Sequence, residues 1–201
     1  LEDPVDLALG GRPTAVQANT GGSGFYRTVL PVTMTASLAV GEDTSPLERF
    51  VLVDDAWAAL LAGRSALADV ESVLRLAAWR ETDPSVWRRL AGAARGLRRL
   101  LGHGDTALGH RARDLARDMA DGPLANLEVL LGTLTETDRD RWEDLRGVLV
   151  SLLGTVGQDA STRLLARELF LAGAGTGPSA DAALEAAALD VVAATGDADD
   201  H

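Results

Sequence analysis

The sequence predicts a mainly α-helical fold: an α-solenoid (HEAT-like superhelix) of antiparallel helix pairs, preceded by a short β-hairpin. Three observations lead to this prediction. From Pro31 onward apolar residues recur with a period of about 3.6 rather than 2. Apolar stretches begin at capping residues and end at glycines. The connections are short, so successive helices must pack against each other. A closed helical bundle is the competing arrangement.

The β-hairpin is expected before Pro31. The stretch TAVQANT (residues 14–20) alternates weakly between apolar and polar side chains, and GFYRTVL (residues 24–30) is rich in β-forming residues. Between them, TGGS supplies glycines for the positive φ angles of a hairpin turn. Because two strands alone are marginally stable in water, we expect this hairpin to lie on a sheet or a helical layer.

The clearest helix begins at Ser45, where Pro46 suits the first helical position and Glu48 completes a capping box. Gly63 is expected to end it. Another helix is expected to stop at Gly122, with a new one beginning at Pro123. About eight helices of roughly 12 to 20 residues follow from the whole pattern. They cover residues 45–63, 65–81, 84–102, 105–122, 123–136, 138–157, 159–173 and 178–196, after a short helix over 31–40.

Composition excludes several classes of function. The 201 residues contain no cysteine, which rules out disulfides, zinc–thiolate sites and thiol nucleophiles. All 19 Lys+Arg residues are arginine, so there is no P-loop or Schiff-base lysine. A net charge of −11 argues against nucleic acid as a partner. No apolar run reaches the ~18 residues of a membrane span, so no membrane partner is expected. We expect a cytoplasmic protein with the arginine-rich bias of a GC-rich bacterial genome.

No catalytic, metal or cofactor site is expected in this chain. The stretch TGGSGF fails the nucleophile-elbow pattern because Phe25 stands two positions after Ser23. It also fails the dinucleotide pattern, because Arg27 stands where the third glycine belongs. The sequence has three histidines but no H-E-x-x-H motif. A hydrolase built on Ser23 is therefore rejected.

Two groups of charged residues are candidates for binding. Asp54 and Asp55 lie within the strongest helix, where aspartate has poor propensity. We expect them to pair with an arginine of an adjacent helix, and a ligand group in a cavity is the alternative. Arg88, Arg95 and Arg99 fall near one helix face. They form a stripe suited to holding a carboxylate, although pairing with neighbouring Asp and Glu side chains is the favoured interpretation.

Three stretches in order, NTGGSGFYRTVLP, SPLERFVLVDDAWAALLAGR and ETDPSVWRRL, resemble the C-terminal region of the aminopeptidase N-type zinc metallopeptidases, especially bacterial members. In that family an Asn-x-Gly-x-x-Gly-Phe-Tyr-Arg hairpin closes a β-sandwich domain, and a helix with a paired aspartate follows. The residues of this chain that match these motifs are Asn19, Gly21, Gly24, Phe25, Tyr26, Arg27, Asp54, Asp55 and Trp57.

The resemblance implies a domain division and a set of partners. Residues 1–30 would be the hairpin remnant of a preceding β-sandwich domain, and residues 31–201 a helical superhelical domain that is truncated at its C-terminus. The zinc, its ligands and the catalytic glutamate of the parent enzyme would lie upstream. The partners would be the upstream catalytic and β-sandwich domains and, in the parent, the peptide substrate. A severed helical array would also expose apolar surface, so self-association is expected.

Two hypotheses of function follow. The first is a non-catalytic C-terminal domain fragment of a zinc aminopeptidase, which shapes and gates the peptide-substrate chamber. The second is an α-solenoid scaffold that binds a protein partner along its concave face. An H-E-x-x-H motif upstream in the native gene, followed about eighteen residues later by a glutamate, would discriminate the two.

Overall fold

A computed structural model describes residues 15–102, 106–134, 136–173 and 181–195, together with residues 8, 10, 11 and 13. These residues form eight α-helices, one 3₁₀ turn and one π-helical turn. In chain order they are η1 (Thr20–Gly22), α1 (Val32–Ala39), α2 (Pro46–Leu61), α3 (Leu67–Ala78), α4 (Pro84–Leu101), α5 (Ala107–Leu131), α6 (Glu136–Leu152), η2 (Leu153–Gly157), α7 (Ala160–Gly173) and α8 (Ala182–Thr195).

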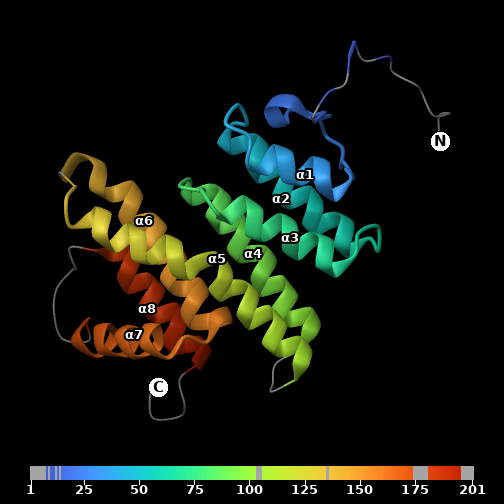
Figure 1. Cartoon of the computed structure of the whole chain (residues 1–201). Helices are drawn as coiled ribbons and strands as arrows, with labels where there is room; N and C mark the ends of the chain where they lie inside the picture. The colour runs from blue at the N-terminus through green and yellow to red at the C-terminus, as the bar shows by residue number, and fades with distance from the viewer. Residues whose placement is uncertain are drawn as a thin grey trace.

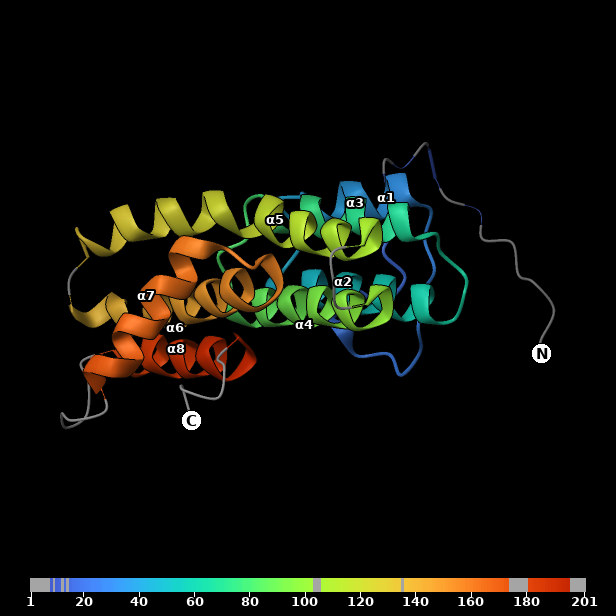
Figure 2. The same cartoon turned by 90° about the horizontal axis from the view of Figure 1, so that it is seen from below.

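The helices labelled in Figure 1 lie in two layers, which Figure 2 shows from the side. In one layer α2 packs on α4, α4 on α6 and α6 on α8; in the other α1 packs on α3 and α3 on α5. Figure 2 shows α1, α3 and α5 in one row and α2, α4 and α6 in the next. At the C-terminal end α7 packs on α8, and η2 packs on α5. Helices two apart in sequence are therefore neighbours within a layer.

Contacts between α4 and α6 show the direction of the helices within a layer. Arg88 binds Asp144 and Arg95 binds Ser151, each partner 56 residues further along the chain. Because the two contacts advance together along both helices, α4 and α6 run parallel. The intervening α5 must then return in the opposite direction. Repeated pairs of opposed helices stacked in this way give a solenoid-like arrangement.

The strongest sequence prediction, the helix that begins at Ser45, is confirmed. The Ser45 hydroxyl accepts a hydrogen bond from the Glu48 backbone N–H, and the Glu48 carboxylate accepts one from the Ser45 N–H at 2.8 Å. Pro46 is the first residue of α2. After the C-cap at Ala62, Gly63 takes φ = 67°, the left-handed conformation that favours glycine.

The expected break at Gly122 and Pro123 is wrong, because α5 runs without interruption from Ala107 to Leu131. Pro123 has no N–H to donate to the carbonyl of Met119, which costs the helix one hydrogen bond. The helix continues because its apolar face is buried on both sides of the proline, with Met119 before it and Leu127 after it in the same core. Burial of these side chains outweighs the single missing bond.

The expected β-hairpin is not formed by the described residues before Pro31, which contain the 3₁₀ turn η1 and extended or bent segments but no strand. The positive φ angles expected at the glycines of this turn are confirmed, since Gly21 and Gly22 have φ = 71° and 65°. The flanking backbone, however, donates to α2: the Gly21 N–H to Glu48 at 3.0 Å and the Thr28 N–H to Asp55 at 3.1 Å. The carboxylates of Glu48 and Asp55 on α2 thus accept backbone N–H groups that would bond to the opposite strand in a hairpin.

The core is centred on α4, which contacts α2, α3, α5 and α6. Its Trp87 and Leu90 are completely buried. Small residues allow the closest approaches: a Cβ on Gly96 would lie 2.5 Å from the Trp57 ring, and one on Gly154 would lie 2.4 Å from Val191. A separate small cluster of Ala166, Ala188 and Val191 joins α7 to α8. Among the described residues no helix is both long enough and apolar enough to cross a bilayer.

Candidate functional site

The segment from Asn19 to Arg27 is a compact turn closed by a side-chain amide. The Gly24 N–H donates to Asn19 Oδ1 at 2.8 Å, and Asn19 Nδ2 donates to the Gly24 carbonyl at 3.2 Å. Asn19 is 7% exposed, so the amide is held within the structure. The Tyr26 hydroxyl donates to the Ala18 carbonyl, and its ring leaves no room for a Cβ at Gly24, which would lie 2.3 Å from it. Asn19, Gly24 and Tyr26 therefore act together as one turn.

Glu48 joins this turn to α2. Its Oε1 accepts the Gly21 N–H at 3.0 Å, and its Oε2 accepts the N–H and the hydroxyl of Ser45, both at 2.8 Å. The hydrogen bonds from Gly21 and then from Ser45 lower the pKa of Glu48, since each stabilises the ionised carboxylate. One side chain thus caps the helix and fixes the preceding segment to it.

Asp54 and Asp55 fix the other end of the segment. Asp54 accepts hydrogen bonds from Arg27 and, at 2.7 Å, from Arg89 Nε of α4. Asp55 is 4% exposed and accepts from the Thr28 N–H, the Thr28 hydroxyl and, at 3.2 Å, Arg27 Nη1. An arginine from an adjacent helix was the expected partner, and Arg89 takes that place. The hydrogen bonds to Asp54 and then to Asp55 raise the pKa of Arg27, because both stabilise the charged guanidinium.

A cavity of about 370 Å³ lies beside Asp55, between residues 28–32, α2 and the start of α3. Its polar lining includes Asp55, Asp69 and Arg64, and its apolar lining includes Leu52 and Val70. Asp55 therefore bonds to Thr28 and also lines a cavity. It has the surroundings expected of a structural partner and those expected of a group in a cavity.

Phe25 stands apart from this network, with its side chain wholly exposed to solvent. Tyr26 next to it is 53% exposed, although its hydroxyl is bound. Leu47 at the start of α2 is 55% exposed, and it is the side chain nearest to Gly22 of the turn. These three residues, which we call the Phe25 surface, expose large apolar groups, two of them on the anchored segment and one at the start of α2. Exposed apolar clusters of this kind mark interaction sites.

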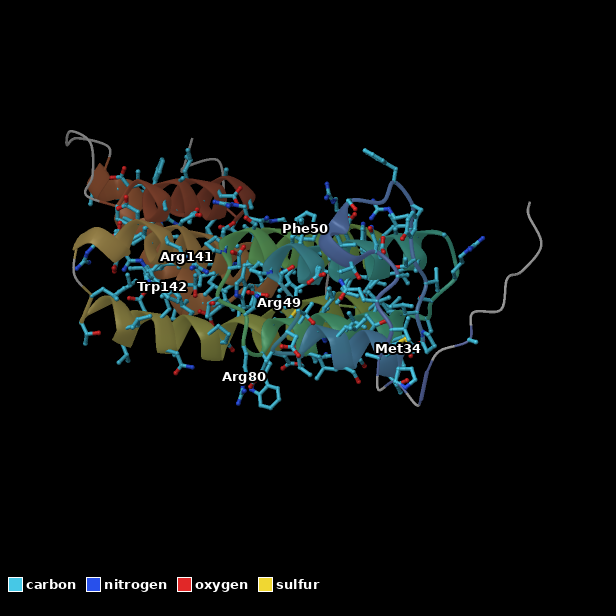
Figure 3. The ribbon with its side chains drawn as sticks, turned by 90° about the horizontal axis from the view of Figure 1, so that it is seen from above. Met34, Arg49, Phe50, Arg80, Arg141 and Trp142 are labelled. Carbon is cyan, nitrogen blue, oxygen red and sulfur yellow. The ribbon has the colours of Figure 1, made fainter. Side chains whose placement is uncertain are left out.

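A second buried network lies between α2 and the α3–α4 turn. Arg49 donates to Glu81 through two parallel hydrogen bonds, Nε to Oε2 at 2.6 Å and Nη2 to Oε1 at 3.0 Å. Glu81 Oε1 also accepts the N–H groups of Thr82 and Asp83, and the Glu81 carbonyl accepts Trp87 Nε1 at 3.0 Å. Figure 3 places Arg49 among the helices and Arg80 at the outer edge of the molecule. The network ties α2 to the α3–α4 turn through hydrogen bonds between protein groups.

The three arginines of the predicted stripe differ in their partners: Arg88 and Arg95 pair with acidic residues, whereas Arg99 pairs with none that the structure describes. Arg88 pairs with Asp144 of α6, and Arg95 Nη2 binds Ser151 at 2.6 Å and Asp190 of α8 at 3.4 Å. Both arginines line an open groove of about 500 Å³ between α4, α6 and α8. Arg99 is exposed and has no ion-pair partner among the described residues. The charges of Arg88 and Arg95 are thus largely taken up by acidic neighbours.

The described residues offer no zinc site. They contain no group of three or more His, Cys, Asp or Glu side chains placed to hold a metal ion. His103 and His201 lie outside the described residues. The donor set that a catalytic zinc requires, three protein ligands around one open position, is therefore not assembled within the described part of the chain.

Comparison with known families decides the assignment. The sequence model of the ERAP1-like C-terminal domain matches residues 15–201. This chain belongs to that family. The ERAP1-like C-terminal domain is the C-terminal helical domain of the M1 aminopeptidases of the aminopeptidase N type, so the resemblance seen in the sequence is confirmed. No curated protein and no solved structure matches the chain.

Several residues that organise this ERAP1-like domain escaped the sequence analysis. Glu71 of α3, 4% exposed, binds Arg111 of α5 through two hydrogen bonds at 2.6 and 2.9 Å. Gly96 and Gly154 let a tryptophan and a valine of neighbouring helices approach the backbone. The available signal was a glycine within an apolar helical pattern, which often marks close packing. A buried glutamate leaves no such mark, because its partner is 40 residues away.

Proposed function

We propose that this chain is the non-catalytic C-terminal helical domain of a zinc-dependent aminopeptidase and that it shapes and gates the chamber holding the peptide substrate. The observation that carries the proposal is the family match across residues 15–201. The helix pairs stacked in two layers support it, because such arrays form HEAT-like superhelices with extended concave surfaces. The bound zinc of the parent would activate the water that attacks the peptide bond.

The contribution of this chain would be steric and electrostatic. The groove between α4, α6 and α8 presents Arg88, Arg95, Asp144 and Asp190 around an apolar floor. Groups of both signs on rigid helices suit the orientation of a zwitterionic peptide chain. That the parent is bacterial and cytoplasmic stays a proposal that rests on composition, in which arginine supplies all 19 Lys+Arg side chains.

We further propose that the upstream β-sandwich domain covers the Phe25 surface. Residues 1–30 would then belong to that domain and residues 31–201 to the helical domain. The support is the contrast within one segment: Asn19, Arg27 and Thr28 are bonded tightly, whereas the Phe25 ring between them is bare. A large apolar side chain held rigidly in water is costly unless a partner covers it.

The test uses the full-length parent enzyme encoded by the native gene. Phe25→Ser should loosen the contact between domains, so that the helical domain melts in a separate, earlier calorimetric transition. Val129→Ser on α5, where valine is 74% exposed, is the matched control and should leave a single transition. Identical melting of both variants would refute the proposed contact.

The isolated 201-residue chain tests the non-catalytic role. It should neither bind zinc tightly by calorimetry nor cleave aminoacyl-arylamides. Zinc-dependent turnover by this chain would overturn the assignment of the chemistry to the upstream part.

The alternative function is a scaffold that binds a protein partner. The observation that favours it is the open groove of about 500 Å³ between α4, α6 and α8. The upstream coding sequence separates the two proposals. An H-E-x-x-H motif with a glutamate about eighteen residues later supports the peptidase. If the motif is absent, the scaffold is supported.

A further inference from the structure

Four arginines converge where α6 ends. Three of them bind one five-residue stretch: Arg163 Nε donates to the Gly154 carbonyl at 3.0 Å, Arg117 Nε to the Gly157 carbonyl at 2.7 Å, and Arg113 Nη1 to Gln158 Oε1 at 3.2 Å. The fourth, Arg98 of α4, lies close enough to Arg113 and Arg163 for their charges to interact. We call these four side chains the arginine cluster.

The end of α6 explains why arginines gather there. The helix widens into the π-helical turn η2 and stops at Gln158, which takes the left-handed conformation with φ = 51°. The final carbonyls of a helix lack partners within the helix and carry its negative dipole end. Guanidinium groups from α5 and α7 satisfy the carbonyls of residues 154, 157 and 158. This accounts for the position of the cluster but uses little of its hydrogen-bonding capacity.

The cluster carries excess positive charge. None of the four arginines forms an ion pair with a carboxylate of the described residues. Burial, and then the charge of Arg113, lower the pKa of Arg98. The pKa of Arg163 is also lowered, first by burial and then by the charges of its cationic neighbours, of which Arg98 has the largest effect. Arg98 and Arg163 thus lie in the field of other guanidinium groups.

The nearby carboxylates offset this excess only in part. Asp159 lies near Arg117 and Arg163, but its Oδ1 is engaged by Ser161 and by Thr162 at the start of α7. Asp121 lies near Arg117, yet burial and the charge of Asp159 raise the pKa of Asp121. Neither Asp159 nor Asp121 bonds to any of the four arginines in the described structure.

Most donors of the cluster form no hydrogen bond with the described residues. Each guanidinium carries five N–H bonds. Arg117 uses two of its donor groups, at Gly157 and Gln158, while Arg113 and Arg163 use one nitrogen each. Among the described residues, Arg146 Nε is the one buried side-chain nitrogen or oxygen without a partner. The unused nitrogens of the cluster are therefore not completely buried, and all four side chains are half-buried.

We infer that the arginine cluster is a binding site for a compact phosphate-type oxyanion, a dianion held by guanidinium groups from α4, α5 and α7. Two features favour this ligand class. The planar fork of an arginine matches two oxygens of a phosphate. A doubly charged ion also neutralises more of the local positive charge than a single carboxylate does. Long polyanions such as nucleic acid are disfavoured, because the chain as a whole carries −11.

This site is distinct from the groove lined by Arg88 and Arg95, whose charges meet Asp144 and Asp190. It stands independently of the proposed peptidase role, so failure of either leaves the other in place. Figure 2 shows the region where α7 begins, beside α4 and α5; η2 contacts all three of these helices.

The first experiment titrates the 201-residue chain with inorganic phosphate at constant ionic strength and follows the arginine Nε–Hε resonances by NMR. The signals of Arg98, Arg113, Arg117 and Arg163 should shift together and saturate, while that of Arg139 stays in place. Arg139 lies near the other end of α6, about 22 Å from Gly154 at 1.5 Å per residue. Equal shifts of all arginines, or no saturation, would overturn the inference.

Variants supply the second test. Arg98→Gln with Arg113→Gln removes two charges without removing a bond to a backbone carbonyl. Loss of charge-assisted hydrogen bonds should weaken phosphate binding by about tenfold or more in calorimetry. Arg139→Gln, which removes one charge from the same chain at a distance, should bind as the wild type does. Equal binding by both variants refutes the site.

A third titration separates ligand classes. Acetate at the same ionic strength should bind at least about tenfold more weakly than phosphate, because it offers one charge rather than two. Acetate binding equal to that of phosphate would overturn the assignment to a phosphate-type ligand. Sulfate, a dianion of similar shape, should compete with phosphate, and failure to compete would count against it equally.

Discussion

Arg49 of α2 and Glu81 of the α3–α4 turn form two parallel hydrogen bonds, at 2.6 and 3.0 Å, and the Glu81 side chain is fully buried. The pair ties α2 to the start of α4, because Glu81 also holds the Thr82 and Asp83 N–H groups that lead into that helix. A buried carboxylate tolerates this position only while its cationic partner is present. The consequence for stability can be measured.

Arg49→Leu should lower the free energy of unfolding by about 3 kcal/mol, because it leaves the Glu81 carboxylate buried without a counter-charge. Urea unfolding followed by circular dichroism gives the value. Arg88→Leu is the control, since Arg88 and Asp144 are 55% and 38% exposed. Exposed ion pairs contribute at most about 1 kcal/mol. If the two variants lose equal stability, the Arg49–Glu81 pair does not have the special role inferred for it.

Gly96→Ala should destabilise the chain by about 1–3 kcal/mol, although alanine is the better helix former. The added methyl would lie 2.5 Å from the Trp57 ring, so either α2 or α4 must move. Gly92→Ala on the same helix is the control, because only the flexible end of Arg89 lies near it. We expect that control to be neutral or slightly stabilising in thermal unfolding. A stabilising Gly96→Ala would mean that Trp57 does not pack as described.

Acid should weaken the attachment of the N-terminal segment through Glu48. Its pKa is lowered in the folded state by the hydrogen bonds from Gly21 and Ser45. A lowered folded-state pKa means that the carboxylate stabilises the fold fully above its unfolded pKa, about 4.3 for glutamate, and that this stabilisation is lost as pH falls through the folded-state value. Glu48→Gln should therefore be less stable at pH 7 and show a flatter decline in acid.

The measurement for Glu48 is the urea midpoint at a series of pH values. Asp159, whose pKa is lowered first by the Ser161 hydroxyl and then by Thr162, should contribute a decline of the same sign. Some acid sensitivity must therefore remain in Glu48→Gln. A variant whose midpoint falls as steeply as that of the wild type would contradict the role given to Glu48.

Asp55→Asn should speed amide hydrogen exchange at Thr28, because the Asp55 carboxylate accepts the Thr28 N–H at 3.1 Å. The amide of asparagine is a weaker acceptor for this N–H and for Arg27. Exchange followed by mass spectrometry of the peptide around residues 24–31 reports the change. Asp144→Asn, which alters a distant exposed pair, should leave that peptide unaffected. Unchanged exchange in Asp55→Asn would show that the segment is held by other contacts.

The isolated chain should self-associate through α7. Leu164 and Leu171 are 60% and 64% exposed and lie two helical turns apart on one face. Light scattering should give a mass that rises with concentration, and Leu164→Glu with Leu171→Glu should return it to the monomer value. Val129→Glu, at an exposed valine on α5, should not. A strict monomer at high concentration would refute self-association.

The sequence predicted most of the helices correctly, but it did not predict the structure of the segment before Pro31. The capping box at Ser45 and the positive φ of Gly63 depend on neighbours within a few residues, so the pattern alone predicted both. The arginine partner of Asp54 was expected in kind, but its identity as Arg89 depends on how α2 and α4 pack. The exposure of Phe25 had no signal in the pattern, because an aromatic residue in a β-rich stretch is ordinarily buried.

By itself, the sequence determined a chain of amphipathic helices with short connections and the family to which it belongs, because periodicity, caps and motifs are written in adjacent residues. Tertiary structure alone decided that α5 passes through Pro123 and that the segment before Pro31 bonds to α2 instead of pairing with itself. The physical reason is the same in both cases. A local preference of a few kcal/mol yields when distant groups offer burial or hydrogen bonds that no neighbour in sequence can supply.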